Sequence, residues 1–282
     1  MAEPQLEAVI NFRDVGKTVN QFLGQRRLRE GVFYRSALPD QATLRDRKAI
    51  ASELGIKTIV DLRSDTEKLE EAERFQVSLQ ERRESYPLRM PGLAYHDIKV
   101  LGRAFESNLT RYLSWWSFFK VMFLLLIGNR VTAVSLVARE VMSPRGLVRM
   151  GLDAIDHSGP EICQTLRLYT DAGALPSLVH CTQGKDRTGL ICCLVLMILD
   201  VPISAIEYDY RLTDAGPASD RELRAAQARH VGLSEDWAYT DKEMISRTEK
   251  HLNTVHGGLN AYLDRNGFGH EDRQRIREAL LY

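Results

Sequence analysis

The sequence predicts an α/β protein with a central, mostly parallel sheet flanked by helices. Short β-branched and apolar segments alternate with longer segments of helical spacing, a pattern typical of parallel sheets. One of the strands, at 177–180, leads through a loop into an apolar helix. The 282 residues are many for one small domain and few for two large ones. We therefore expect a single domain over 1–282 that carries an insertion.

Two strands are predicted in the first hundred residues. A short strand is expected at 32–34, and a helix over 42–54 ends at Gly55, a residue favoured just beyond a helix end. The β-branched segment 57–62 is expected to form a buried strand. The charged segment 66–75 is then expected to form an exposed helix.

The insertion is predicted at about 102–151, where the composition changes. Two or three helices are expected there, and 101–150 carries seven basic residues against two acidic ones. Its aromatic cluster includes Trp115, Trp116, Phe118 and Phe119. Two interpretations stay open: ordinary core packing, or a helical lid whose part at 111–130 makes transient contact with a membrane surface.

The core pattern resumes in the second half of the chain. A helix is expected over 161–171, followed by the strand at 177–180 and a buried helix over 188–199 that is apolar on all sides. Pro202 suits the first turn of the next helix. The remainder, 221–282, has the charged pattern of exposed helices joined by glycine turns.

The composition also narrows the class of protein. Basic and acidic residues are equal in number, which gives no indication of nucleic-acid binding. Four cysteines are too few for a disulfide framework and fit a reducing compartment. The apolar runs 121–127 and 190–199 are shorter than the about 20 residues that cross a bilayer. Residues 1–10 lack the apolar core of a secretory signal, so we expect a cytoplasmic protein.

The chemistry is predicted to lie between His180 and Gly189, which reads His-Cys-Thr-Gln-Gly-Lys-Asp-Arg-Thr-Gly. A strand delivers the chain to Cys181, and a helix begins at the end of the loop. Such a loop points successive backbone N–H groups inward, and the helix adds the positive end of its dipole, so a dianion is favoured. The phosphate-binding residues expected here are Thr182, Gln183, Gly184, Lys185, Thr188 and Gly189.

Three side chains of this segment are predicted to act directly. The positive field favours the thiolate form of Cys181, which is an activated nucleophile toward a phosphate held by amides. The planar fork of Arg187 can bind two equatorial oxygens of the phosphate. Thr188 can donate a hydrogen bond to the cysteine sulfur and make it a better leaving group. The sequence thus predicts hydrolysis of phosphate monoesters through a phosphocysteine.

The spacing disfavours other classes of site. A nucleotide P-loop needs Gly and Ser or Thr where this chain has Val179 and Asp186. No Cys or His pair shows metal-ligand spacing, so neither a metal nor another cofactor is expected. A module that only binds phosphorylated ligands has no need of Cys181, and the ending Arg187-Thr188-Gly189 argues against a sulfurtransferase.

The segment 180–189 resembles the signature of the protein tyrosine phosphatase superfamily. Its Gly-Lys-Asp-Arg-Thr-Gly form is similar to an atypical bacterial and fungal branch, related to the secreted mycobacterial tyrosine phosphatase B. The resemblance extends to 11–16, 34–36, 60–64 and 257–263, and the middle region looks most like fungal members. It implies a dual-specificity-phosphatase-like fold with a helical lid, no metal, and activity on phosphotyrosine, extending to phosphoserine and phosphothreonine.

The leaving oxygen needs a proton, and the chain has no Trp-Pro-Asp sequence to supply it from a mobile loop. Asp186 is the nearest candidate for the general acid, and the resemblance also points to it. Asp61 and Asp65, at the end of a predicted strand, are alternatives. A structural partnership between Asp186 and Lys185 is the competing interpretation.

Two basic residues bear on the substrate. Lys185 could contact a second phosphate of an inositol ring, since phosphoinositide phosphatases carry a lysine at this loop position. Thr182 is neutral where a second lysine would strengthen that reading. Arg63 is a candidate for substrate binding or for a buried ion pair. A phosphorylated protein and a phosphoinositide are therefore both candidate substrates.

Overall fold

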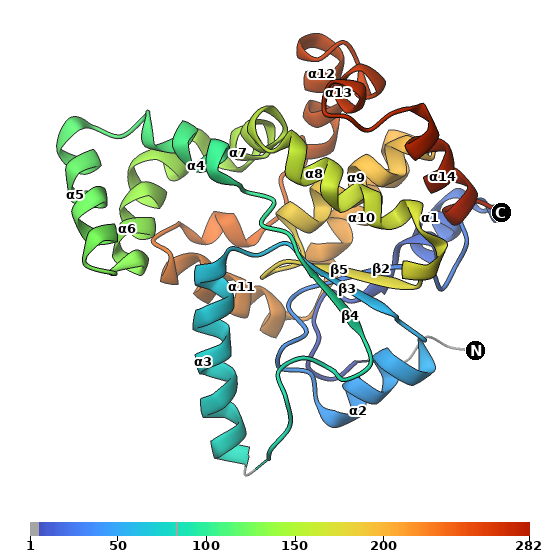
Figure 1. Cartoon of the computed structure of the whole chain (residues 1–282), viewed down its shortest axis with the longest axis horizontal. Coiled ribbons are helices and arrows are strands. Elements are labelled where there is room, and N and C mark those ends of the chain that lie inside the picture. The colour runs from blue at the N-terminus through green and yellow to red at the C-terminus, as the bar shows by residue number, and fades with distance from the viewer. Residues whose placement is uncertain (1–5, 83) are drawn as a thin grey trace.

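The computed structural model describes residues 6–82 and 84–282 and confirms the α/β class (Figure 1). The sheet has the order β1-β2-β5-β3-β4. Its strands are β1 (Arg13–Asp14), β2 (Phe33–Ser36), β3 (Thr58–Asp61), β4 (Ala94–Asp97) and β5 (Ser177–His180). β1 pairs antiparallel with β2, and the other three pairings are parallel. The expected strands therefore lie within a residue or two of their predicted places.

The central strand β5 is covered on both faces, as its continuous apolar pattern predicts. Val179 and Val60 point into the larger core, which includes α9 (Asp186–Ile198) and α8 (Gly159–Arg167). Leu178 and Ile59 point the other way, into a smaller core beside α2 (Leu44–Lys48). This alternation is the two-residue period of a strand. β5 therefore holds the residue after it, Cys181, at the middle of the molecule.

The remaining helices lie around this sheet or extend away from it (Figure 1). They are α1 (Val15–Leu23), α3 (Asp65–Arg82), α4 (Arg103–Thr110), α5 (Trp115–Leu126), α6 (Arg130–Val137), α7 (Ser143–His157), α10 (Ile203–Arg211), α11 (Ala218–His230), α12 (Met244–Val255), α13 (Leu259–Arg265) and α14 (His270–Leu280). In the described part of the chain, no helix has both the length and the apolar content to span a membrane. Residues 1–5, part of the segment predicted to lack a secretory signal, lie outside the described residues.

Several predicted boundaries differ from the structure. The helix expected over 161–171 is α8, which ends at Arg167 and is followed by a 3-10 turn at 168–170. The helix expected over 66–75 continues to Arg82, because Phe75 and Leu79, one turn apart, are both buried. The helix expected over 42–54 changes to π-helical geometry at 49–53 and ends before Gly55, whose φ of 62° is the left-handed conformation expected there. The end of α3 is difficult to predict from the sequence, because its many charged surface residues leave little apolar periodicity.

The insertion predicted at about 102–151 is helical throughout most of its length, and α7 carries the helical structure on to His157. Within it, α5 and α6 form a pair, here called the α5–α6 hairpin (115–137), which extends from the body of the molecule (Figure 1). Val121 and Leu124 of α5 pack on Ala133 of α6 in a small cluster of their own. The core-packing interpretation is therefore wrong for the outer face of α5, where Trp116 is 84% exposed. Closure of a lid over the active site stays a prediction.

Candidate active site

The loop from Cys181 to Arg187, here called the Cys181 loop, joins the central strand β5 to α9 (Figure 1). Cys181 is buried directly after β5, and α9 begins at Asp186. Gly184 adopts a φ of 64°, and a Cβ there would lie 2.2 Å from the carbonyl oxygen of Ser36. Glycine is therefore required at 184 for both the backbone conformation and the space, which lets the loop turn tightly.

The carbonyl groups of the Cys181 loop are held from behind. Nδ2 of Asn11 donates to the carbonyl oxygens of Gln183 (3.2 Å) and Gly184 (2.9 Å). Nη2 of Arg35 donates to the same Gly184 oxygen at 2.7 Å. Because these carbonyls are turned toward the protein, the neighbouring N–H groups are left to face the other side. An arrangement of this kind is typical of an anion-binding concavity of backbone N–H groups.

A buried ion-pair network fixes these supporting residues. Asp209 on α10 accepts from Arg13 and Arg35, with the Arg13 Nε contact at 2.8 Å. Burial raises the pKa of a carboxyl group, but the two arginines outweigh it here and lower the pKa of Asp209. Asn11, Arg13 and Arg35 lie in segments that carried the family resemblance. The sequence analysis did not identify Asp209, which lies 174 residues after Arg35 along the chain and contacts Arg13 and Arg35 only in the folded protein.

Arg187 is held by Glu67, a residue that the sequence analysis missed. Nη1 and Nη2 donate to Oε2 and Oε1 of Glu67 at 2.7 and 2.6 Å. The hydroxyl of Thr182 also donates to Oε1. Burial alone would raise the pKa of Glu67, but Arg187 and Thr182 hold it well below its usual range. Glu67 is thus a fixed anion that spans both ends of the Cys181 loop.

A local signal for Glu67 was present in the sequence. Ser64 and Glu67 have the Ser-x-x-Glu spacing of a helix capping box. In the structure the backbone N–H of Ser64 donates to Oε2 of Glu67 at 2.9 Å, at the start of α3. The capping explains where Glu67 sits, but its contact with Arg187 spans 120 residues of chain.

Part of the guanidinium of Arg187 is left without a hydrogen bond to any described residue. The bidentate contact uses the two Nη atoms, and among the described residues no acceptor is bonded to Nε. A guanidinium that is gripped end-on can still present its side edge, Nε and one Nη, to two oxygens of a phosphate. Glu67 therefore orients this edge without occupying it.

Thr188 and Gly189 complete the start of α9. The Thr188 hydroxyl is buried, and no described residue forms a hydrogen bond with it. A buried, unpaired hydroxyl costs free energy, so it is available for an acceptor that the reaction creates. A Cβ on Gly189 would come within 3.0 Å of the Tyr210 ring. Gly189 thus permits α10 to pack closely on α9.

Lys185 has no exposed surface, and its ammonium group is already paired. Nζ donates to Oδ1 of Asp186 at 2.8 Å and to the carbonyl oxygen of Tyr239 at 3.1 Å. Its charge is therefore used inside the protein and is not presented to a second phosphate. The side chain of Asp186 is 40% exposed, which leaves it accessible from the solvent side of the loop.

The predicted substrate-binding Arg63 forms the buried ion pair instead. Its guanidinium contacts Asp40 and Asp61, each at 2.7 Å. Burial opposes ionisation of Asp61, but His180 and Arg63 lower its pKa to about 2. A carboxyl group with that pKa carries no proton to donate near neutral pH. Asp65, the other alternative acid, is mostly exposed and pairs with Lys68 at 3.0 Å.

Comparison with known proteins decides the family. A model of the tyrosine phosphatase family matches residues 4–282 of the chain. The chain belongs to the tyrosine phosphatase family. It is also similar to a protein of Nostoc commune named tyrosine-protein phosphatase, with 22% identity over 258 residues, which cover 88% of this chain and 74% of that protein. The enzyme is thus a protein-tyrosine phosphatase, a phosphoric monoester hydrolase.

The other three cysteines of this tyrosine phosphatase, Cys163, Cys192 and Cys193, are buried in the larger core. Burial raises the pKa of Cys192 and of Cys193 to about 12, and that of Cys163 to about 11. Thiols with such values are neutral and inert near pH 7. Among the described cysteines, Cys181 is the one that lies in the loop between β5 and α9.

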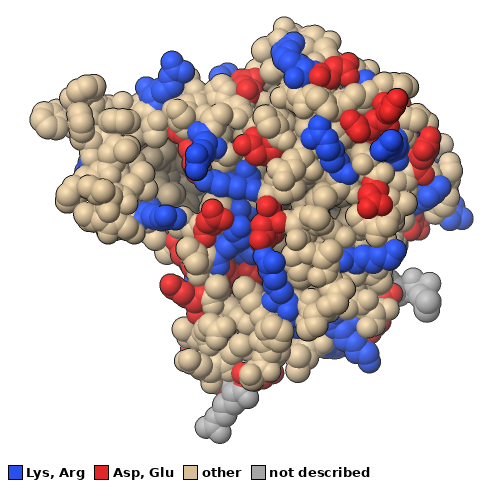
Figure 2. Space-filling view, in the orientation of Figure 1, with Lys and Arg blue, Asp and Glu red and all other residues tan. Residues whose placement is uncertain are grey.

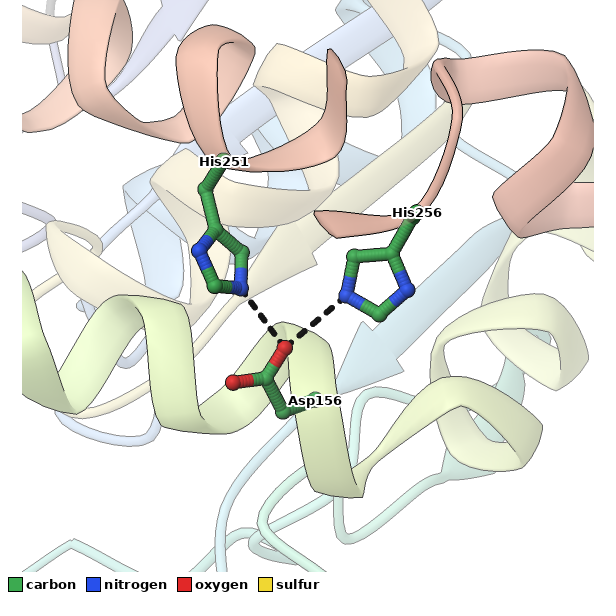
Figure 3. A group of neighbouring side chains, drawn as sticks. All are labelled: Asp156, His251 and His256. Atoms are coloured by element: carbon green, nitrogen blue, oxygen red, sulfur yellow. Dashed lines mark hydrogen bonds and ion pairs between the residues drawn. The ribbon is translucent and has the colours of Figure 1, made fainter. Parts of the chain in front are cut away.

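The phosphatase also contains a polar cluster that the sequence did not indicate (Figure 3). Nε2 of His251 and Nε2 of His256 lie 2.6 and 2.8 Å from the same Oδ1 of Asp156. Two histidines and a carboxylate are a donor set that a metal can use. However, Nη1 of Arg265 faces Nδ1 of His256 at 3.4 Å, which favours the tautomer that carries its proton on Nε2. These contacts fit hydrogen bonds between α7 and the end of α12.

Proposed function

We propose that this phosphatase hydrolyses phosphotyrosine through a phosphocysteine at Cys181. The observation that carries the proposal is the Cys181 loop itself. Its carbonyls are tied back by Asn11 and Arg35, and Arg187 projects from the first turn of α9. Backbone N–H groups, a helix N-terminus and a guanidinium then converge on the ligand side of the thiol.

In the first step the Cys181 thiolate attacks phosphorus. The S–P bond forms as the bond between phosphorus and the tyrosine oxygen breaks, and the electron pair stays on the leaving oxygen. Asp186 donates a proton to that oxygen from Oδ2, since Oδ1 accepts from Lys185 and the side chain is accessible at the edge of the loop. The free edge of Arg187 and the loop N–H groups stabilise the charge on the equatorial oxygens.

In the second step water attacks the phosphocysteine. The ionised Asp186 accepts a proton from this water as the new O–P bond forms. The S–P bond breaks, inorganic phosphate leaves, and the cysteine returns to the thiolate. Thr188 donates its otherwise unpaired hydroxyl proton in a hydrogen bond to the departing sulfur, which makes that sulfur a better leaving group.

The proposed substrate class is phosphotyrosine in proteins, with phosphoserine and phosphothreonine as extensions. The name of the Nostoc commune relative supports it. The Gly-Lys-Asp-Arg-Thr-Gly segment supports a place in the atypical branch related to the mycobacterial enzyme, where the loop aspartate replaces a Trp-Pro-Asp acid. We also propose a reducing compartment, the cytoplasm, because the nucleophile must stay a free thiol.

The structure supports a phosphoinositide substrate less than the sequence does. The lysine that suggested them, Lys185, is buried and bonded to Asp186 and Tyr239. Activity on an inositol phospholipid would therefore need contacts from other residues, or a different position of Lys185.

The test compares a phosphotyrosine peptide with an inositol phospholipid at equal concentration, using the wild type and Cys181→Ser. We expect faster turnover of the peptide. Cys181→Ser should remove turnover of both, while vanadate still binds because the loop amides and Arg187 remain. Residual turnover within about tenfold of the wild type would contradict the phosphocysteine mechanism. Faster turnover of the phospholipid would reassign the substrate class and leave the mechanism intact.

A further inference from the structure

The α5–α6 hairpin carries an apolar surface that no other described part of the chain covers. Of the large hydrophobic side chains that are exposed among the described residues, eleven of twenty lie between Tyr112 and Val134. In Figure 2 the corresponding part of the molecule, at the left, is mostly tan, while the rest of this face carries many charged groups. Contiguous exposed apolar surface of this kind marks an interaction site.

The exposed residues form one face of α5. They recur at helical spacing along its outer side and continue past its end. Trp115 and Trp116 are 72% and 84% exposed at the first turn, and Leu126 is 84% exposed at the last. The set on this face is Trp115, Trp116, Phe119, Met122, Phe123 and Leu126. The inner side, with Val121 and Leu124, packs on α6. The outer face of α5 is thus as apolar as the face that packs.

The charged residues within the hairpin itself are all basic, and the nearest acidic group is the Glu140 carboxylate, which accepts from the backbone N–H of Ser114 before α5. Between Glu106 and Glu140 the chain contains no acidic residue, whereas it contains Arg111, Lys120, Arg130 and Arg139. Lys120 and Arg130 are both exposed, and no ion pair within 4.0 Å between described residues involves either of them. An apolar face with tryptophans and a basic border matches an anionic lipid surface, where aromatic rings sit at the headgroup level.

The dimensions favour a helix that lies in the surface. At about 1.5 Å per residue the 12 residues of α5 extend over about 18 Å, well short of the about 30 Å of a hydrocarbon core. A second copy of the chain is a less suitable occupant. In a symmetric dimer the same patch meets itself, which would bring the basic border of one hairpin against that of the other.

We propose that the outer face of the α5–α6 hairpin docks this phosphatase onto anionic membranes. Trp116 and Leu126 enter the interface, and Lys120 and Arg130 contact the lipid headgroups. The hairpin lies beyond the edge of the sheet at which the parallel strands end (Figure 1). The Cys181 loop begins at the same edge, directly after β5. Docking would therefore bring the active site toward phosphorylated residues of membrane-associated proteins.

The test measures cosedimentation of the full chain with two kinds of vesicle: phosphatidylcholine alone, and phosphatidylcholine mixed with phosphatidylserine. We expect strong binding to the mixed vesicles, which weakens as salt is added. Trp116→Glu with Leu126→Glu should reduce binding by more than about tenfold. Lys120→Gln with Arg130→Gln should reduce it about 25-fold on mixed vesicles, since each basic residue near the surface is worth about fivefold.

The matched control is Leu69→Glu on α3, where the leucine is 61% exposed and far along the sequence from the hairpin. It should bind vesicles like the wild type. Turnover of a small aryl phosphate without lipid should be unchanged in every variant, which shows that the fold and the proposed phosphatase activity are intact. Failure of the wild type to bind mixed vesicles, or equal binding by the Trp116 and Leu126 variant, would overturn the proposal. A lipid-free dimer that this variant dissociates would assign the face to a second copy.

Discussion

The contact between Glu67 and Arg187 leads to the most direct test of the site geometry. Replacing Glu67 by Gln keeps the size of the side chain and an oxygen acceptor, and removes the charge. The variant loses the symmetric carboxylate that accepts from both Nη atoms, and the amide nitrogen of the glutamine repels one of them. Arg187 is then free to adopt other orientations, and the hydroxyl of Thr182 loses a strong acceptor.

The size of the effect follows from the strength of this pair. A hydrogen bond to a charged group contributes about 1.5–3 kcal/mol when buried. Arg187 and Glu67 are partly accessible, so solvent screening reduces that figure. A loss of about 1.4–2.8 kcal/mol in transition-state stabilisation corresponds to about 10- to 100-fold in kcat/KM. We therefore expect Glu67→Gln to retain measurable activity, unlike a variant of Cys181.

The assay is kcat and KM for a small aryl phosphate, together with vanadate binding and the melting temperature. If Glu67 positions Arg187, kcat/KM falls while the melting temperature changes little. Glu67→Asp keeps the charge on a shorter side chain and should restore part of the loss. The control is Glu70→Gln, one turn further along α3, where the carboxylate pairs with surface residues.

Two results would refute this reasoning. Unchanged kcat/KM would show that Arg187 needs no help from Glu67. An increase in kcat/KM with tighter vanadate binding would show that the carboxylate competes with phosphate for Arg187, so that Glu67 inhibits the free enzyme instead of orienting it.

Three further changes test other parts of the structure. Asp186→Asn should slow alkyl phosphates by about 10²- to 10⁴-fold and activated aryl phosphates far less, since a proton donor matters most for poor leaving groups; an equal loss for both would assign Asp186 to a structural role with Lys185. Gly184→Ala should abolish vanadate binding, measured by calorimetry, because the new Cβ collides with the backbone of Ser36. Asp156→Asn should lower stability to urea by about 1–2 kcal/mol at neutral pH. Burial raises the pKa of Asp156, but hydrogen bonds from His251 and His256 outweigh it and lower that pKa. The stabilisation by the ionised Asp156 is therefore present above the unfolded-state pKa of about 3.9 and is lost as the pH falls through the folded-state pKa. A constant difference between variant and wild type down to pH 2 would contradict this.

The contiguous part of the site could be predicted from the sequence. Cys181, Gly184, Arg187 and Thr188 lie within eight residues, and a strand, a tight loop and a helix follow one another there in the predicted order. Local chemistry determines this geometry, since glycine is needed where φ is positive and an apolar helix must follow a buried strand. The α/β class was predictable for the same reason, because alternating strand and helix periods are local patterns.

The partners of that segment were decided by the tertiary structure. Glu67, Asn11 and Asp209 reach the Cys181 loop or its supporting residues across more than a hundred residues of chain. Asn11 and Asp209 are ordinary polar residues, and no spacing along the chain distinguishes them from their neighbours. The Ser-x-x-Glu spacing at 64–67 predicts where Glu67 lies but not its contact with Arg187. Each of these three residues has many possible partners in the sequence, and only the fold brings a specific arginine or carbonyl within hydrogen-bond distance.

The sequence also could not predict whether a side chain is buried or exposed where its residue type suits both environments. Lys185 resembles a phosphate ligand in sequence, yet the fold directs its ammonium group to Tyr239 and Asp186. The residues of 115–127 suit a core or an exposed docking face equally, because hydropathy describes a side chain and not what lies beside it. Only the packing of α5 on α6 decides which side of that helix is covered and leaves Trp116 in the open.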